Sequence, residues 1–288
     1  MVRLLSYLIY KFLNLLGFIL GTKKYHFLLN NLRNKLEQNN YQKMSINNSI
    51  VNFYSPNEIC NWRYKTLFTK EPETLEWINK FKKSDNLVFW DIGANIGIYS
   101  IYAAIFHKNI KVVAFEPSTS NLRVLSRNIS INNFSNKIII NQTPLFDKDF
   151  SFQKMNEEGF IEGGALNAFS VNYGYDGKKF NPKNSYNIYG TSINFLLSND
   201  ILEIPDYIKI DVDGIEDLIL KGAEKFLKHE KIKSILIELN ESFANQTKNS
   251  INILKKNNFE ISYKKHSKEF DNSKKYSSIY NYVFNKIK

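Results

Sequence analysis

The sequence predicts an α/β protein built on a mostly parallel sheet with helices on both faces. Continuous apolar runs at 87–90, 111–117, 137–142, 207–214 and 233–240 alternate with helical stretches. This alternation is typical of parallel strands joined by crossover helices, and runs without polar interruption predict strands that are buried on both faces. With only six prolines among 288 residues, long low-complexity linkers are not expected.

Residues 4–20 are predicted to form an amphipathic helix. Polar or small residues recur every three or four positions on one face, and large apolar residues fill the other. The polar or small set is Arg3, Tyr7, Tyr10, Asn14, Gly17 and Gly21. Three alternatives stay open: packing on the main domain or a partner chain, peripheral association with a membrane interface, and a true span or signal. Lys11 interrupts the apolar stretch, which disfavours a signal peptide.

The remaining elements are expected in a regular order. Residues 22–44 have a helical pattern, and 44–54 alternate like an accessory strand. Glu71-Pro72-Glu73 is predicted to open a helix, because proline and acidic residues both suit a first helical turn. Further helices are expected at 98–106, 118–132, 215–228 and about 247–257, and closing strands at 260–265 and 281–287.

The pattern divides the chain into two parts. Residues 1–70 are predicted to hold the amphipathic helix and an accessory segment, and residues 71–288 to form the α/β domain. Residues 147–190 interrupt the alternation and hold half of the twelve glycines together with many aromatic residues. Such a segment is predicted to be a binding loop, a lid or a hairpin that extends the sheet.

Charge and cysteine content limit the partners and the compartment. The formal net charge is +11, but the lysines are dispersed along the chain in pairs such as Lys23-Lys24 and Lys255-Lys256. Nucleic-acid binders concentrate their basic residues on one element, so no nucleic-acid partner is predicted. Cys60 is the single cysteine, which excludes an intrachain disulfide and favours a cytoplasmic protein.

The turn after the first strand carries the strongest chemical signal. It reads DIGANIG over 91–97, between a strand and a helix, with glycines spaced Gly-x-x-x-Gly. This is not the G-x-G-x-x-G spacing of a pyrophosphate site, which disfavours a nucleotide-cofactor oxidoreductase. Asp91 would repel a pyrophosphate but suits an ammonium, as in S-adenosylmethionine. Glu116 ends the next strand, where its carboxylate is able to accept both hydroxyls of a ribose.

Four blocks of the sequence resemble the FkbM family of S-adenosylmethionine-dependent methyltransferases. They are VFWDIGANIGIYS (88–100), AFEPSTSNLRVLSRNISIN (114–132), YIKIDVDGIEDLILKGAEKFL (207–227) and SILIELN (234–240). The resemblance implies a class I, Rossmann-like methyltransferase sheet of seven strands, the last antiparallel, and an O-methyltransferase that often acts on sugars of natural products or surface glycans. Many relatives read Glu and Ala where this chain has Asp213 and Ile215.

The resemblance also implies positions for the cofactor. It places the turn at the methionine end and Glu116 on the ribose, with Asp211 beside the reactive methyl. The residues predicted to bind the cofactor are therefore Asp91, Gly93, Ala94, Asn95, Gly97, Glu116 and Asp211.

Three acids near the carboxyl ends of two strands are the catalytic candidates. Methyl transfer to an alcohol requires alignment of the hydroxyl and removal of its proton, which a carboxylate performs. Asp211 is the leading candidate, followed by Asp213 and Glu238; the alternative for Asp211 is a helix cap. Together with Asn240 these oxygens resemble a Mg²⁺ ligand set. Successive strand residues face opposite sides, however, so no metal is predicted.

The functional prediction is O-methylation of a hydroxyl on a sugar, surface glycan or glycolipid, as part of polysaccharide biosynthesis. The alternative is a non-catalytic, cofactor-binding scaffold in a glycan assembly complex. The intact Asp91–Gly97 turn and Glu116 argue against loss of cofactor binding in either case.

Overall fold

A seven-stranded sheet forms the centre of the computed structural model, which describes residues 1–271, 273 and 275–287. The strand order is β11-β12-β10-β9-β3-β4-β5, and β12 alone runs antiparallel to its neighbours in this sheet. The strands are β3 (Leu87–Ile92), β4 (Ile110–Phe115), β5 (Ile138–Asn141), β9 (Tyr207–Ile210), β10 (Ser234–Asn240), β11 (Phe259–Lys265) and β12 (Ile279–Lys286). The predicted class I sheet with its antiparallel last strand is confirmed.

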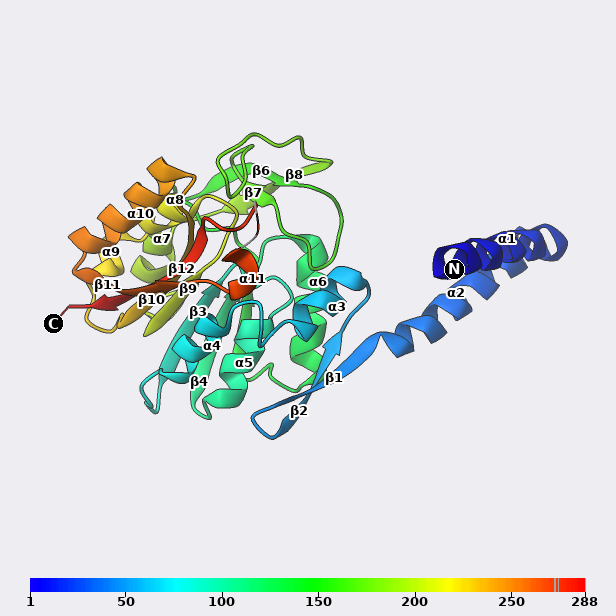
Figure 1. Ribbon diagram of the computed structural model, residues 1–288, viewed down its shortest axis with the longest axis horizontal. Helices are drawn as coiled ribbons and strands as arrows, with labels where there is room; N and C mark the ends of the chain where they lie inside the picture. The colour runs from blue at the N-terminus through cyan, green and yellow to red at the C-terminus, as the bar shows by residue number, and fades with distance from the viewer. Residues whose placement is uncertain (272, 274, 288) are drawn as a thin grey trace. The chain divides into compact units, whose positions relative to one another are not determined.

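Helices cover both faces of this sheet (Figure 1). One face packs against α4 (Pro72–Asn79), α5 (Ile98–Phe106) and α6 (Thr119–Ile131). The other face packs against α7 (Ile193–Ser198), α8 (Glu216–Lys221), α9 (Glu224–Leu227) and α10 (Ala244–Lys256). A short α11 (Lys268–Asp271) precedes the last strand. Every residue of β3 is buried, as expected of a strand covered on both faces.

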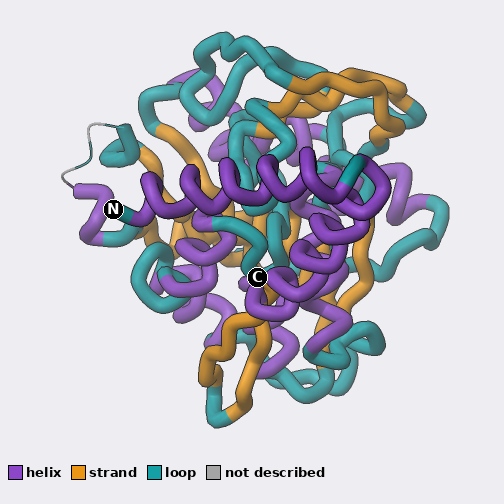
Figure 2. The backbone as a smooth tube through the Cα atoms, turned by 90° about the vertical axis from the view of Figure 1, so that its right-hand side faces the viewer, coloured by secondary structure: helices purple, strands orange, loops and turns teal. Residues whose placement is uncertain are grey.

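The inserted region forms a second sheet at the top of Figures 1 and 2. Its three strands are ordered β7-β6-β8, with β6 (Ser151–Glu157) paired antiparallel to both β7 (Asn167–Phe169) and β8 (Asn184–Gly190). Segment 158–166 and segment 170–183 connect these strands. Residues 147–190 therefore combine the two predicted forms, a hairpin-like sheet and long connecting loops.

Residues 43–70 belong to the same compact unit as the main sheet, which spans Lys43–Lys288. The segment contains most of β1 (Tyr41–Ile46), together with β2 (Ser49–Tyr54) and α3 (Glu58–Lys65). The sequence placed the domain boundary at residue 70, whereas the structure divides the chain after Gln42. The physical reason is burial, because apolar residues of β2, α3 and the following loop pack in the same core as α5 and α6. These residues are Val51, Phe53, Tyr54, Cys60, Tyr64 and Leu67.

The first unit, Met1–Gln42, is a pair of helices. The helix α1 (Val2–Leu20) turns at Gly21 into α2 (Thr22–Glu37), followed by one 3-10 turn at Gln38–Asn40. Tyr25 of α2 packs on Gly17, and its hydroxyl donates to Oδ1 of Asn14 at 2.8 Å. Most of the apolar face of α1 is not covered within this unit, since its leucine, isoleucine and phenylalanine side chains are exposed except for the half-buried Leu13 and Leu16. By length and composition α1 could cross a membrane.

Candidate functional site

The DIGANIG turn is held in one shape by close backbone contacts. The N–H groups of Gly93 and Ala94 both donate to the carbonyl of Phe115 on the neighbouring strand, at 3.0 and 2.9 Å. Gly93 has a φ of +84°, and a Cβ at this position would lie 1.9 Å from the carbonyl oxygen of Asp211. Only glycine allows the turn to approach the end of β9 this closely. Gly97, with a φ of +85°, is the N-cap residue of α5.

Asp91 lies fully buried beneath the turn. Its Oδ2 accepts a hydrogen bond from the Ser100 hydroxyl at 2.6 Å, while its Oδ1 has no partner among the described residues. Burial raises the pKa of this carboxyl, although the neighbouring Lys209 opposes the rise. A buried acceptor without a partner is costly, so this oxygen is a place where a ligand or a water would be stabilised.

Lys209 is the cation that the sequence analysis missed. It lies in the middle of β9 directly beside Asp91 on β3, and its side chain is fully buried. Its Nζ lies 2.7 Å from Oδ2 of Asp211 and 5.0 Å from the ring centre of Tyr99. Burial works against the charge of Lys209, but the carboxylates of Asp211 and Asp91 raise its pKa. The lysine therefore stays charged in the core.

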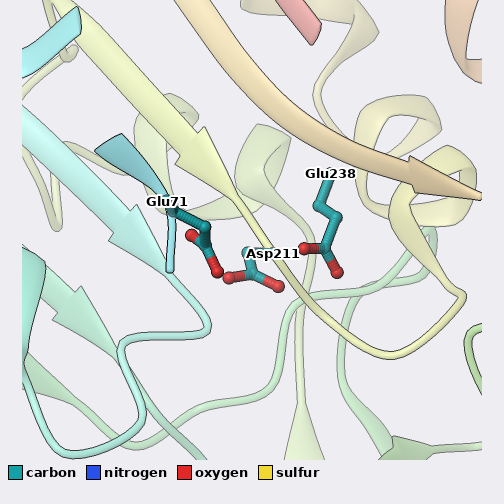
Figure 3. Close-up of side chains that lie close together, drawn as sticks. All are labelled: Glu71, Asp211 and Glu238. Carbon is teal, nitrogen blue, oxygen red and sulfur yellow. The ribbon is translucent and has the colours of Figure 1, made fainter. Parts of the chain in front are cut away.

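Three carboxylates, those of Glu71, Asp211 and Glu238, lie close together (Figure 3). Glu71 comes from the residue before α4, Asp211 from the end of β9 and Glu238 from β10. One carboxylate oxygen from each of the three lies within 4.8 Å of the other two. Two of them are already paired: Asp211 with Lys209, and the fully buried Glu71 with Lys70 and with the Tyr99 hydroxyl at 2.8 Å. Glu238 accepts no hydrogen bond from the described residues.

The environment pushes the pKa values of Asp211 and Glu238 in opposite directions. Burial opposes ionisation of Asp211, but Lys209 and Lys70 lower its pKa. Burial and the charge of Asp211 raise the pKa of Glu238 well above its ordinary value. Asp211 is thus held as a carboxylate by its lysine, while Glu238 has the greater affinity for a proton.

The spacing of the three carboxylates would also permit a divalent cation. Lys70 and Lys209 already balance two of the three charges. This pairing favours the metal-free site expected from the sequence, and the absence of a metal stays a prediction. Glu71 was not among the expected residues, because it lies 140 residues from Asp211 and no local pattern distinguishes it.

Asp213 has a different position from the other acids. Its Oδ2 accepts hydrogen bonds from the backbone N–H groups of Leu166 and Asn167, at 2.7 and 3.1 Å. Burial raises its pKa to about 6. The expectation that Asp213 joins the catalytic group is not supported by this geometry, because its carboxylate fixes the inserted region where β7 begins. Asn240 likewise holds the insertion, donating to the Tyr175 carbonyl at 3.1 Å.

Glu116 is enclosed at the end of β4. Its two carboxylate oxygens accept from the backbone N–H groups of Asn95 and Ser118, each at 2.8 Å, and burial raises its pKa to about 7. The side chains of Asn95 and Asn121 donate to the Gly164 carbonyl at 2.8 and 3.2 Å, so segment 158–166 lies next to this position. Each oxygen of Glu116 still has a second lone pair for a ligand hydroxyl.

Two cavities adjoin this group of residues. The larger contains about 400 Å³ of space that is partly open to solvent, and it is lined by Arg63, Thr66, Lys70, Gly93, Ala94, Asn95, Ile96, Ile98, Tyr99, Lys209 and Asp211. The smaller contains about 210 Å³ of space that is also partly open to solvent, and it is lined by Tyr175, Glu216, Glu238, Asn240, Gln246 and Ile279. Asp211 therefore lies at the first cavity and Glu238 at the second, although their carboxylates belong to one cluster.

Several solved structures are similar to this chain. A TrmK structure from M. capricolum, in complex with S-adenosyl-homocysteine, is 15% identical over 74% of this chain and 68% of its own, with a TM-score of 0.42. The precorrin-6y C5,15-methyltransferase of Geobacter metallireducens is 15% identical, covers 75% of this chain and 86% of its own, and has a TM-score of 0.44. An rRNA methylase of Streptococcus thermophilus is 11% identical, covers 75% of this chain and 95% of its own, and has a TM-score of 0.46. No curated protein matches the chain.

The family comparison covers the central part of the molecule. The model of the FkbM methyltransferase domain matches residues 91–261, which is more than half of the chain. The match begins at Asp91 and ends in β11, so it includes the turn, Glu116, Asp211 and Glu238. This chain belongs to the FkbM methyltransferase family and is an S-adenosylmethionine-dependent methyltransferase.

Proposed function

We propose that this protein methylates a hydroxyl oxygen of a sugar, in a glycan or glycolipid. The observation that carries the proposal is the position of Glu238. This carboxyl group belongs to the cluster beside the cofactor turn and also lines the second cavity, and it has no hydrogen-bond partner among the described residues. A hydroxyl bound in the second cavity would therefore meet a free proton acceptor on the side that faces the cofactor.

The residues around the turn fit S-adenosylmethionine. Oδ1 of Asp91 and Oδ1 of Asn95 are buried acceptors with no hydrogen-bond partner in the described part of the chain, and they suit an ammonium, directly or through a water. Gly93, Ala94 and Gly97 shape the turn, and Glu116 retains lone pairs for the ribose hydroxyls. When bound, the cofactor supplies an electrophilic methyl group on its sulfonium.

Glu238 is the residue best placed to accept the proton of the acceptor hydroxyl. Its raised pKa makes it a stronger base than an ordinary carboxylate, whereas Lys209 holds Asp211 ionised and less basic. Asp211 would then orient the hydroxyl or stabilise the positive centre of the cofactor. The structure thus favours Glu238 over the sequence's leading candidate, Asp211, and leaves Asp213 to fix the inserted region.

The chemistry of the second cavity supports a hydroxylated acceptor. Gln246 is buried, and its Oε1 has no hydrogen-bond partner among the residues that the structure describes, while its Nε2 donates to the buried carboxyl of Glu216. Tyr175 contributes an aromatic ring from the inserted region. Hydroxyl groups donate well to amide and carboxylate oxygens, whereas two acidic side chains disfavour a phosphate group in the same space.

The direct test is methyl transfer from radiolabelled S-adenosylmethionine to a panel of sugars and glycolipids, with RNA and a carboxylate metabolite as comparison acceptors. We expect label in the hydroxylated acceptors, on oxygen, as located by mass spectrometry. Labelling of RNA instead would reject the sugar assignment. Cofactor binding without transfer to any acceptor, measured by calorimetry, would favour the alternative, a non-catalytic scaffold of a glycan assembly complex.

We also propose that the first unit binds the surface of an anionic membrane, from a cytoplasmic location. Residues 1–36 contain six basic residues and no acidic residue: Arg3, Lys11, Lys23, Lys24, Arg33 and Lys35. The same residues present the uncovered apolar face of α1. Basic charge together with an exposed apolar helix is typical of segments that lie in a lipid interface. A glycolipid acceptor would be consistent with this location.

A further inference from the structure

The larger cavity is completed by residues that precede the family domain. Arg63 of α3 and Lys70 line it opposite the DIGANIG turn, yet both lie outside the matched range 91–261. Their segment, residues 43–70, is part of the same compact unit as the sheet. The cofactor cavity is therefore built from two regions of the chain.

The cations around this cavity differ in what they bind. Lys209 is paired with Asp211, and Lys70 with Glu71. Arg63 uses only its Nε, which donates to the carbonyl of Gly163 at 2.5 Å. Its two terminal nitrogens have no hydrogen-bond partner in the part of the chain that the structure describes. Among the cations that line the cavity, Arg63 is thus the one without a carboxylate partner in the described part of the chain, and both of its terminal nitrogens are available to a ligand.

The Gly163 contact also fixes the guanidinium group. Held at Nε and lying 5.9 Å from the ring centre of Trp62, the half-buried side chain loses little further freedom on binding. A guanidinium with both terminal nitrogens free matches a carboxylate, which it binds through two parallel hydrogen bonds. S-adenosylmethionine has one anionic group, the carboxylate of its methionine part.

We propose that Arg63 binds the α-carboxylate of the cofactor. The cofactor's ammonium would then lie toward the carboxylate of Asp91, and its carboxylate toward the guanidinium of Arg63 on α3. Each charge of the amino-acid end would thus have a partner of the opposite sign. The inference rests on S-adenosylmethionine as the cofactor and does not depend on which acceptor is methylated. It assigns a binding role to the segment that the sequence analysis treated as accessory.

The test is calorimetry on the full-length protein with three ligands. S-adenosylhomocysteine keeps the carboxylate, decarboxylated S-adenosylmethionine lacks it, and 5′-methylthioadenosine lacks the whole amino-acid end. For Arg63→Gln we expect the Kd for S-adenosylhomocysteine to rise about 10- to 100-fold, the usual effect of losing hydrogen bonds to a charged group. The Kd for 5′-methylthioadenosine should change less than about twofold.

Arg127→Gln is the matched control, since Arg127 is another half-buried arginine and its guanidinium lies 4.1 Å from the ring centre of Tyr54. It should leave the Kd for all three ligands unchanged. Equal weakening of S-adenosylhomocysteine and 5′-methylthioadenosine by Arg63→Gln would overturn the proposal, because it would indicate a deformed site. So would an unchanged Kd for both.

The wild-type protein gives a result that does not depend on folding of the variant. It should bind decarboxylated S-adenosylmethionine about 10- to 100-fold more weakly than S-adenosylmethionine. Equal affinity for the two would overturn the carboxylate assignment while leaving the methyltransferase intact. Failure of the wild type to bind any of the ligands would overturn the cofactor itself, and the inference with it.

Discussion

Lys209 shows how a single buried residue organises the site. It neutralises Asp211 directly and lies beside Asp91, in a core where an unpaired carboxylate would be costly. Its long side chain reaches along the strand to the edge where the cofactor turn lies. The sequence could not reveal this role, because one lysine in an apolar run has the same local pattern whether its side chain is buried or exposed.

Removing the charge of Lys209 tests whether it stabilises the buried carboxylates. We expect Lys209→Met to lower the free energy of unfolding by about 3–5 kcal/mol, because it leaves buried carboxylates without a cation. The exposed pair of Lys111 and Glu203 supplies the control, and Lys111→Met should change stability by less than about 0.5 kcal/mol. Chemical denaturation measures both variants. Similar stability of the two would show that Lys209 is not needed to hold the site.

The proton acceptor is the second question at the scale of the residue. Glu238→Gln keeps the shape of the side chain and removes the base, so turnover should fall roughly 10²- to 10⁴-fold. Glu241→Gln, three positions further and paired with Lys264, should leave turnover unchanged. Steady-state kinetics with the true acceptor decide between Glu238 and Asp211, since near-normal turnover in folded Glu238→Gln would return the role to Asp211.

The same assignment has a pH signature. A base with a raised pKa is protonated, and therefore inactive, over a wider acidic range than an ordinary glutamate. The kcat/KM of the wild type should accordingly rise with pH through the Glu238 pKa, at a pH above 4.5. The residual kcat/KM of Glu238→Gln should not show this rise with pH. An unchanged pH profile in the variant would assign the titration to another group.

At the scale of the elements, the carboxyl edge of the sheet determines where the site lies. The predicted helix 98–106 coincides with α5. The DIGANIG turn lies between β3 and α5, as the sequence predicted. The helix expected at 215–228 is instead two short helices, α8 and α9, separated at Gly222, where a Cβ would lie 2.1 Å from the Phe146 carbonyl. That break depends on a tertiary contact, which no local pattern contains.

The site itself was predictable only in part. Asp91, the glycines and Glu116 were recognisable because motif order and strand ends carry a local signal. Glu71 and Arg63 were not, because they reach the site from segments whose position depends on packing in the core. Asp213 follows the end of a strand, as a catalytic acid would, and was therefore predicted to join the site. Its carboxylate instead accepts hydrogen bonds from backbone N–H groups of the inserted region, which the local sequence does not indicate.

The anchoring of the inserted region can be measured. Asp213→Asn removes the charge that accepts from Leu166 and Asn167, so we expect faster amide hydrogen exchange across β7 and a loss of about 1–3 kcal/mol in its local opening free energy. Exchange in β3 should not change. If β7 exchanges at its wild-type rate in the variant, Asp213 is free for another role and returns to the list of catalytic candidates.

At the scale of the whole molecule, the chain consists of two compact units with different physical properties. The unit Lys43–Lys288 has a buried core on both faces of its sheet, whereas Met1–Gln42 leaves its apolar side chains uncovered within the unit. A helical pair of this kind gains stability from what it binds rather than from its own core. The two units should therefore respond differently to truncation.

Deleting residues 1–37 removes both helices and leaves the larger unit with its core. We expect this variant to melt cooperatively and to bind S-adenosylhomocysteine with wild-type affinity, as measured by calorimetry. It should no longer sediment with vesicles that contain anionic lipid. Unfolding or aggregation of the variant would instead show that α1 packs on the rest of the protein, which is the alternative left open by its sequence.

Charge substitutions in the full chain separate electrostatic attraction from apolar insertion. Each lysine near an anionic surface contributes about 1 kcal/mol, so Lys23→Gln combined with Lys24→Gln should weaken vesicle binding roughly 30-fold. The pair Lys255→Gln and Lys256→Gln, at the end of α10, removes the same charge from the other unit and should have little effect. Because salt screens exposed charges, the difference between the two variants should shrink as ionic strength rises. Equal weakening by both pairs would mean that the dispersed positive charge of the whole chain, and not the first unit, attracts the membrane.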